Sequence, residues 1–229
     1  ITGKNIISKI TELTTILKKK KIDNIFISAP ENLAWLLNLR GQDNPNSPIP
    51  NCRAIITRDK KIFLFTDFYK IKKIKKLPIY NKIFFKKYDE FFSTMSELKG
   101  KTFCIDELTC SVYFHSLINS KFYIKSYNDP CYNLKSIKNS SEIKQMKKAH
   151  LYDGAALTKF LFWLKNIKKK KLDELGVERK LENFRKKNKN YLYPSFNTIA
   201  GSGPNGAIIH YRANKKSNRK IANNDLLLC

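Results

Sequence analysis

Three histidines are the side chains of this sequence best suited to move protons near neutral pH. His210 follows a glycine-rich segment, residues 201–206, and a short apolar run. This pattern predicts a tight turn between two strands, with His210 at the end of the second strand. A histidine in that position can project into a cleft and act on a substrate, or it can lie half-buried against a backbone carbonyl. The residues by themselves leave both roles open.

The other candidate groups favour structural roles. His150 and Asp153 are three residues apart in a stretch of helical periodicity, so we expect a hydrogen bond between them; no further ligands for a metal stand nearby. His115 is isolated, and we expect it to pack. Arg40 and Asp43 are also three residues apart, and we expect them to pair and brace a proline-rich loop. No Ser/His/Asp set, no pair of catalytic carboxylates and no metal-ligand spacing can be assembled from these residues.

The glycine-rich segment needs separate consideration because Gly201, Gly203 and Gly206 have the spacing of a dinucleotide-binding loop. That motif requires a helix N-terminus directly after the glycines to hold the pyrophosphate. Here Pro204 and a strand-like apolar run stand in its place. The segment is therefore interpreted as a turn, with nucleotide binding as a minor alternative.

The composition is strongly basic. The chain has 229 residues, with 45 Lys and Arg against 19 Asp and Glu, and a formal net charge of +26. Only seven of the basic residues are arginine, the residue that dominates base reading and bidentate phosphate contacts, and the lysines are spread along the whole chain. We therefore expect no specific nucleic-acid partner, and a basic nucleic-acid-binding protein remains the weaker alternative.

Other compositional features indicate the compartment. Lysines interrupt every apolar run before it reaches the roughly 18 residues that cross a bilayer, so we expect no membrane partner. The first residues include neither an initiator Met nor a signal-peptide pattern, and further residues are expected upstream. Five scattered cysteines, none at C-x-x-C spacing, favour reduced thiols in the cytoplasm over a metal knuckle.

The elements that would position these groups differ between the two halves. The first half alternates helical and strand-like patterns, which is typical of an α/β domain, and should end near residue 129. Its helices are expected over residues 6–17, from about 67, over 91–98 and 112–118, and its strands over 22–27, 53–57, 61–65, 102–105 and 122–125. Residues 58–60 should join two of these strands as a hairpin.

The second half changes character. Asn139 with Glu142 three positions later has the capping-box spacing and predicts the start of a long helix over residues 140–164. A second helix is expected through residues 172–184. Strands are expected over 196–200 and 207–211, on either side of the glycine turn, and a last strand-like run covers 226–229.

Three stretches together resemble one enzyme family. They are WLLNLRGQD at residues 35–43, LKSIKN leading to AHLYDGAAL within residues 134–157, and PSFNTI followed by GSGPNGAIIHY within residues 194–211. They resemble aminopeptidase P, and more narrowly the three-domain cytosolic Xaa-Pro aminopeptidases of the creatinase/methionine aminopeptidase superfamily. The stretches follow the family's order over nearly the whole chain, and the third is the most specific.

The resemblance implies an architecture and an activity. Residues 1–129 would be the family's second domain, a creatinase-N-like α/β domain, and residues 130–229 the truncated start of its α+β pita-bread catalytic domain. The family removes an N-terminal residue that precedes proline, with two divalent metal ions, usually manganese. Peptides with proline at the second position are the implied substrates, the cytoplasm the implied location, and a homodimer a state that the family often adopts.

The resemblance also assigns roles to residues. His210 matches the family's active-site histidine, which is not a metal ligand but hydrogen-bonds the substrate and the developing tetrahedral intermediate. The family's metal ligands are two aspartates, a histidine and two glutamates, and all of them follow this histidine. We therefore expect no metal ligands in this chain, since they would lie after Cys229, and we expect the fragment alone to be inactive. A non-catalytic binding protein on the pita-bread fold is the alternative.

Overall fold

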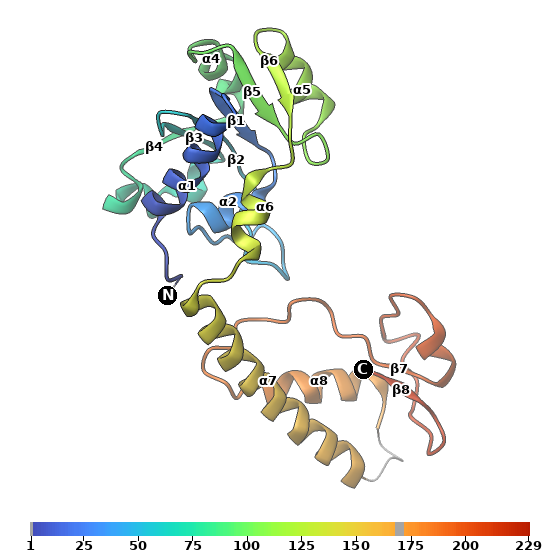
Figure 1. Ribbon diagram of the computed structural model, residues 1–229. Coiled ribbons are helices and arrows are strands. Elements are labelled where there is room, and N and C mark those ends of the chain that lie inside the picture. The colour runs from blue at the N-terminus through green and yellow to red at the C-terminus, as the bar shows by residue number, and fades with distance from the viewer. Residues whose placement is uncertain (1, 168–171) are drawn as a thin grey trace. The chain divides into compact units, whose positions relative to one another are not determined.

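The computed structural model describes residues 2–167 and 172–229, which form two compact units, Ile1–Glu142 and Ile143–Cys229 (Figure 1). In the first unit, six strands form one mixed sheet in the order β4-β3-β2-β1-β5-β6. The strands are β1 (Asn24–Ile27), β2 (Arg53–Thr57), β3 (Ile62–Phe65), β4 (Ile83–Lys86), β5 (Thr102–Ile105) and β6 (Tyr123–Ser126).

The sheet combines a meander with parallel edges. β2 is antiparallel to both β1 and β3, whereas β4 runs parallel to β3, and β5 and β6 continue parallel to β1. The predicted hairpin is confirmed: Ile55 lies opposite Phe63, and Lys60 takes a positive φ of 71° in the turn. β4 is a strand that the sequence pattern did not indicate.

Helices cover both faces of this sheet because each central strand is apolar on both sides. Along β1, Ile25 and Ile27 belong to one core and Phe26 to the other. The first face is covered by α1 (Ile6–Lys19), α2 (Pro30–Leu36) and α6 (Pro130–Ser136), and the second by α4 (Phe91–Ser96) and α5 (Val112–Asn119), as Figure 1 shows. The short helix α3 (Phe68–Ile71) follows β3, where a helix was expected.

The first helix illustrates how local sequence sets these elements. Asn5 caps α1 by accepting a hydrogen bond from the backbone N–H of Ser8 at 2.8 Å. Four apolar residues at helical spacing face the core, and Lys18 and Lys19 lie in the last turn, where the helix dipole favours cations.

The end of the first unit is fixed by buried carboxylates. Asp129 caps α6 through the N–H of Cys131 at 2.9 Å and accepts a hydrogen bond from Asn32 on α2 at 2.7 Å. Its own backbone N–H donates to Asp106. Burial raises the pKa of Asp129. α6 thus packs on α2 within the first unit, which extends past residue 129 to Glu142.

The second unit is built around two helices. The predicted capping box is present, since the N–H of Asn139 donates to Glu142 and the N–H of Glu142 donates back to the Asn139 side chain. It opens α7 (Ser140–Asn166), which begins in the first unit, and α8 (Glu174–Arg185) follows. Their shared core consists of Phe160, Leu172, Val177, Leu181, Ala200 and Ile221. β7 (Gly201–Ser202) pairs antiparallel with β8 (Leu227–Leu228), within the last strand-like run.

The segment around the glycines differs from the expected hairpin. Residues Gly203–Ala207 form a short 3-10 helix with Pro204 in its first turn, and the structure assigns no strand to residues 196–200 or 207–211. The prediction of a turn between those two strands is therefore wrong. The side chain of Asn205 explains the difference, because it turns inward to bond a buried carboxylate and holds the chain in the 3-10 conformation.

Candidate functional site

A buried carboxylate at the start of α8 organises the segment that carries His210. Glu174 is completely buried. It accepts hydrogen bonds from the backbone N–H of Ser202 at 2.8 Å and of Arg219 at 2.9 Å, from the Asn205 amide at 3.0 Å and from the Tyr211 hydroxyl at 2.6 Å. One side chain therefore ties together the strand β7, the 3-10 helix and two later loop positions.

These contacts keep Glu174 ionised. Burial alone would raise the pKa of its carboxyl, but hydrogen bonds from Tyr211 and from the N–H groups of Ser202 and Arg219 outweigh it and lower the pKa. A buried carboxylate whose lone pairs are used this fully is a rigid anchor, since removing it would leave several donors unsatisfied.

A second carboxylate supports the same segment. Asp225 accepts hydrogen bonds from the Ser202 hydroxyl at 2.8 Å and from the N–H of Ala222 at 2.9 Å, and it pairs with Arg219 at 3.4 Å. Arg219 also donates to the carbonyl of Ser202 at 3.1 Å. The hydrogen bond from Ala222, followed by that from Ser202, lowers the pKa of Asp225.

His210 is the exposed residue next to this anchored segment. The prediction that it ends a strand is wrong: it occupies a turn with a φ of 55°, a conformation that non-glycine residues seldom adopt. Its neighbour Tyr211 is buried, and the Tyr211 hydroxyl lies 2.6 Å from Glu174 and 2.9 Å from the Ser217 carbonyl. The arrangement can present an imidazole to a substrate, because it fixes the backbone on one side of His210 and leaves the ring exposed.

The expected pair on α7 does not form. Nδ1 of His150 lies 2.9 Å from the carbonyl of Met146, one turn earlier on the same helix. Asp153 instead makes a bidentate pair with Arg185 of α8, at 2.6 and 3.2 Å. The predicted hydrogen bond between His150 and Asp153 is thus wrong, because each side chain finds a partner with better geometry. His115 is half-buried on α5.

The expected pair in the proline-rich loop does not form either. Arg40 donates to the carbonyls of Ala34 and Leu39, at 3.2 and 2.7 Å, at the C-terminal end of α2. Asp43 bonds to Lys70 at 2.9 Å. The brace of the loop is therefore Asp43 with Lys70, a partner too distant in the sequence for local spacing to identify.

The residues present do not fit a metal centre. In residues 2–167 and 172–229, no three His, Cys, Asp or Glu side chains are grouped so that they could hold a metal ion. All five cysteines are free thiols. Within the same described ranges, no helix is long and apolar enough to cross a membrane.

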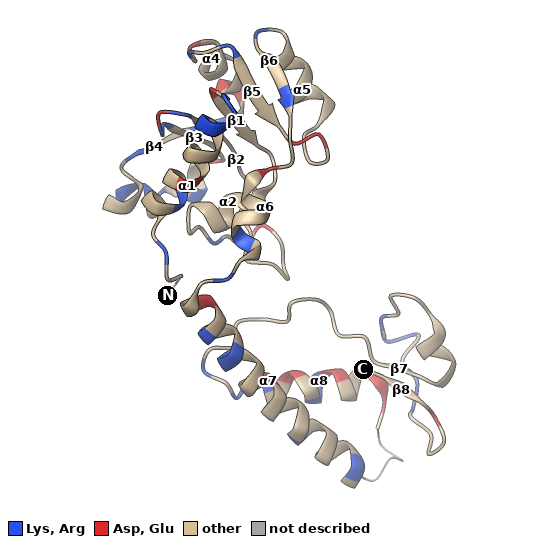
Figure 2. Cartoon of the chain, viewed as in Figure 1, with Lys and Arg blue, Asp and Glu red and all other residues tan. Residues whose placement is uncertain are grey.

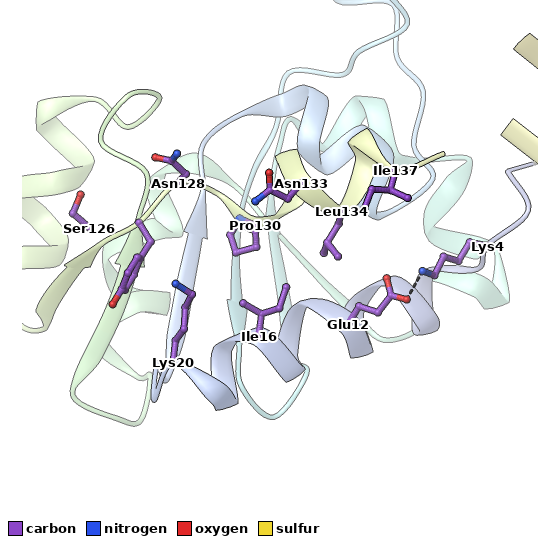
Figure 3. A pocket seen from close by; sticks show the side chains of 11 residues that line it. Lys4, Glu12, Ile16, Lys20, Ser126, Asn128, Pro130, Asn133, Leu134 and Ile137 are labelled. Carbon is purple, nitrogen blue, oxygen red and sulfur yellow. Dashed lines mark hydrogen bonds and ion pairs between the residues drawn. The ribbon is translucent and has the colours of Figure 1, made fainter. Parts of the chain in front are cut away.

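Neither the distribution of charge nor the cavity beside α1 and α6 gives a second candidate for a catalytic site. Figure 2 shows Lys and Arg distributed over the helices and loops of both units. In the first unit, a cavity of about 720 Å³ lies between α1, α6 and the chain after β6 (Figure 3). Its charged groups are already engaged: Lys4 pairs with Glu12, and Lys20 lies 3.8 Å from the centre of the Tyr127 ring.

Sequence reasoning missed the residues that hold the site. Glu174 and Asp225 belong to no recognisable motif, and a single acid carries no periodic signal that distinguishes a buried anchor from a solvated side chain. The position of Glu174 in the sequence was the one signal that could have indicated its role. Glu174 stands in the first turn of α8 directly after the N-cap Asp173, where an acid interacts favourably with the helix dipole.

Comparison with known proteins identifies the family. Residues 1–142 match the model of the Creatinase/Prolidase N-terminal domain. The chain belongs to this family. Residues 144–229 match Metallopeptidase family M24, so this creatinase/prolidase-type chain continues from its N-terminal domain into the start of an M24 domain. The resemblance inferred from the sequence, and the fold class that it implied, are confirmed.

The curated relatives carry a consistent name. A "Probable Xaa-Pro aminopeptidase P" of Paracoccidioides brasiliensis (strain Pb03) is 34% identical over 245 residues, which cover 99% of this chain and 39% of the relative. A protein of the same name from Sordaria macrospora is 31% identical, with the same coverage of 99% and 39%. The creatinase/prolidase-type chain thus spans about two fifths of the length of these relatives.

Solved structures agree on the fold. The crystal structure of an X-prolyl aminopeptidase from Caenorhabditis elegans, described as a cytosolic enzyme with a di-nuclear active site, superposes with a TM-score of 0.88 at 25% identity and covers 99% of this chain and 38% of that one. An Xaa-Pro dipeptidase from Bacillus anthracis, at 22% identity and a TM-score of 0.71, shares the fold over 97% of this chain and 59% of its own.

Proposed function

We propose that the complete protein is a metal-dependent Xaa-Pro aminopeptidase, which removes an N-terminal residue that precedes proline. The observation that carries this proposal is the match of 99% of the chain to relatives named Xaa-Pro aminopeptidase P. The substrates are then peptides with proline in the second position, and the location is the cytoplasm, in line with the cytosolic neighbour from C. elegans.

His210 is the group that this chain contributes to the reaction. In the proposal, its imidazole hydrogen-bonds the peptide substrate and the oxygen of the tetrahedral intermediate, where negative charge develops. The fixed backbone at Tyr211 supports this role, because a donor aimed in advance at the developing charge needs no reorganisation during the reaction. The exposed ring has no competing hydrogen bond with the residues described.

The metal ions belong to other residues of the complete protein. We propose two divalent ions, with manganese as the metal, held by residues after Cys229; the described residues contain no fitting set. The 229 residues alone would then not cleave peptides. We also propose that the complete protein forms a homodimer. Neither a nucleic acid nor a membrane is among its proposed partners.

The test is peptidase activity of the complete protein on an Xaa-Pro-Xaa tripeptide, compared with a matched Xaa-Ala-Xaa tripeptide. Cleavage before proline that manganese supports and a chelator removes is the expected result. Absence of cleavage with manganese present would favour the alternative, a non-catalytic pita-bread-fold binding protein. A folded 229-residue chain that cleaves the tripeptide would contradict the assignment of the metal ligands to later residues.

A further inference from the structure

A cavity at one end of the first unit's sheet contains an arginine without a partner. The cavity has a volume of about 380 Å³, within the range of small-molecule sites. Ser28 directly follows β1, Arg53 begins β2, and Asp67 lies just after β3. These three lining residues therefore lie at the same end of three adjacent strands. The carboxyl ends of parallel strands are where open α/β sheets commonly bind ligands.

The guanidinium of Arg53 is held by aromatic rings and lacks a hydrogen bond. Its central carbon lies 5.5 Å from the ring centre of Tyr88 and 5.2 Å from that of Phe114. No described residue accepts a hydrogen bond from it or pairs with it, although it is half-buried. Arg179 and Arg212, which also lack partners among the described residues, are exposed to water instead. Arg53 therefore carries a planar set of donors that is oriented but unused.

The charges around Arg53 restrict the ligand. Lys70, the other cation of the cavity, is neutralised by Asp43 at 2.9 Å and Asp67 at 3.3 Å. Together, Asp43 and Asp67 carry two negative charges against the one positive charge of Lys70. The excess negative charge would repel a dianion more strongly than a monoanion. Burial raises the pKa of the Cys52 thiol to about 12, so this lining group stays neutral and supplies no competing anion.

The Ser28 hydroxyl lines the cavity together with Arg53. It lies 2.7 Å from the Thr109 hydroxyl, which itself donates to the carbonyl of Asp106 at 3.4 Å. The proton of Ser28 is therefore directed at Thr109, and the guanidinium of Arg53 remains the donor for a ligand. Its two parallel N–H groups can pair with one carboxylate.

We propose that this cavity binds a small monocarboxylate through the paired N–H groups of Arg53. This site is independent of the proposed peptidase activity, because it uses residues of the first unit only. The guanidinium fork fits both carboxylate and phosphate, so the single negative charge is what distinguishes the expected ligand from inorganic phosphate.

The experiment is a titration of the isotope-labelled 229-residue chain with sodium acetate, followed by amide NMR shifts at constant ionic strength. We expect saturable shifts confined to the residues around Ser28, Arg53 and Tyr88. Arg53→Gln should weaken binding at least about tenfold, because it removes a charge-assisted pair of hydrogen bonds. Arg58→Gln is the matched control: it removes the same charge just beyond the opposite end of β2, and it should leave acetate binding unchanged.

A second variant and a second ligand test the proposal further. Arg53→Lys keeps the charge but loses the planar fork, so it should weaken binding in a chain whose spectrum stays that of the folded protein, even if Arg53→Gln does not fold. Inorganic phosphate should bind the cavity more weakly than acetate. Shifts spread over the lysine-rich surface, equal affinity in wild type and Arg53→Lys, or phosphate binding as tight as acetate would each overturn the assignment.

Discussion

Different interactions stabilise the interiors of the two units of this chain. The first unit buries apolar residues on both faces of a six-stranded sheet, with aromatic clusters such as Phe26 against Phe91 and Phe114 at centroid distances of 5.3 and 5.0 Å. The second unit has a small apolar core, and the loop that carries His210 is positioned by the buried Glu174 and by Asp225. Apolar packing therefore dominates in the first unit, where buried carboxylates fix only its last helix, whereas two carboxylates position the loop that carries His210 in the second unit.

The chain offers a direct way to follow each region. It has two tryptophans, Trp35 in the first unit and Trp163 in the second. Trp163→Phe leaves a fluorescence signal from the first unit, and Trp35→Phe leaves one from the second. Urea unfolding of these two backgrounds gives separate free energies of unfolding for the predictions below.

The largest effect is expected in the apolar core. Phe26→Ala should lower the free energy of unfolding of the first unit by about 3–5 kcal/mol, because it leaves a cavity among the aromatic rings. Urea unfolding followed through Trp35 measures this change. Leu108→Ala, at a residue that is 88% exposed, is the control and should change it by less than about 0.5 kcal/mol. Equal effects of the two substitutions would show that the face carrying Phe26 is not a packed core.

A comparable effect should follow from removing the buried acid. Glu174→Ala leaves the backbone N–H groups of Ser202 and Arg219 without their acceptor and should lower the stability of the second unit by about 3 kcal/mol or more. Unfolding followed through Trp163 measures it. Glu178→Ala, one turn later on α8, is the matched control. An equally mild result for both acids would contradict the anchoring role of Glu174.

The pH dependence of the second unit should carry the signature of the same residue. The pKa of Glu174 is lower in the folded than in the unfolded chain, so its contribution is complete above the unfolded value of about 4.3 and is lost as the pH falls through the folded value. Stability measured through Trp163 should therefore drop between about pH 5 and pH 3. Glu174→Gln should make the free energy of unfolding less dependent on pH in this range. If its pH dependence stayed that of the wild type, the acid sensitivity would belong to other groups.

The smallest effect is expected at the surface of the second unit. Arg185 and Asp153 form a bidentate pair, but their side chains are 29% and 52% exposed. Asp153→Ala should lower stability by no more than about 1 kcal/mol, because water screens such pairs. Thermal unfolding of wild type and variant, at low and high salt, gives the comparison. A loss as large as that of Glu174→Ala would mean that this pair, too, positions the unit.

The same contrast explains what the sequence could predict. Alternation along Ile25, Phe26 and Ile27 follows from the period of a strand, and the Asn139/Glu142 box follows from the chemistry of a helix start. Five of the six strands of the first unit, several of its helices and α7 were therefore foreseen, whereas the helices α2 and α6 were not. Strand order is a long-range property, so local patterns identified neither β4 nor its place at the edge of the sheet.

The site was predicted only in part for a physical reason. The glycine spacing indicated a turn before His210, but the conformation of that turn depends on Asn205 reaching Glu174, 31 residues earlier in the sequence. Pairings such as Asp43 with Lys70 and Asp153 with Arg185 depend on tertiary contacts in the same way. Local spacing favoured nearer partners, and the fold supplied more distant ones.

The proposed role of His210 is tested most directly by the turnover of the complete protein on an Xaa-Pro-Xaa tripeptide after His210→Ala. We predict a fall in kcat of about 10²-fold or more, because a donor to the transition-state oxygen is lost. His150→Ala is the control, since that histidine contacts a carbonyl of its own helix, and it should retain the wild-type rate. A wild-type kcat in His210→Ala, with manganese present, would contradict the assignment of His210 to the active site.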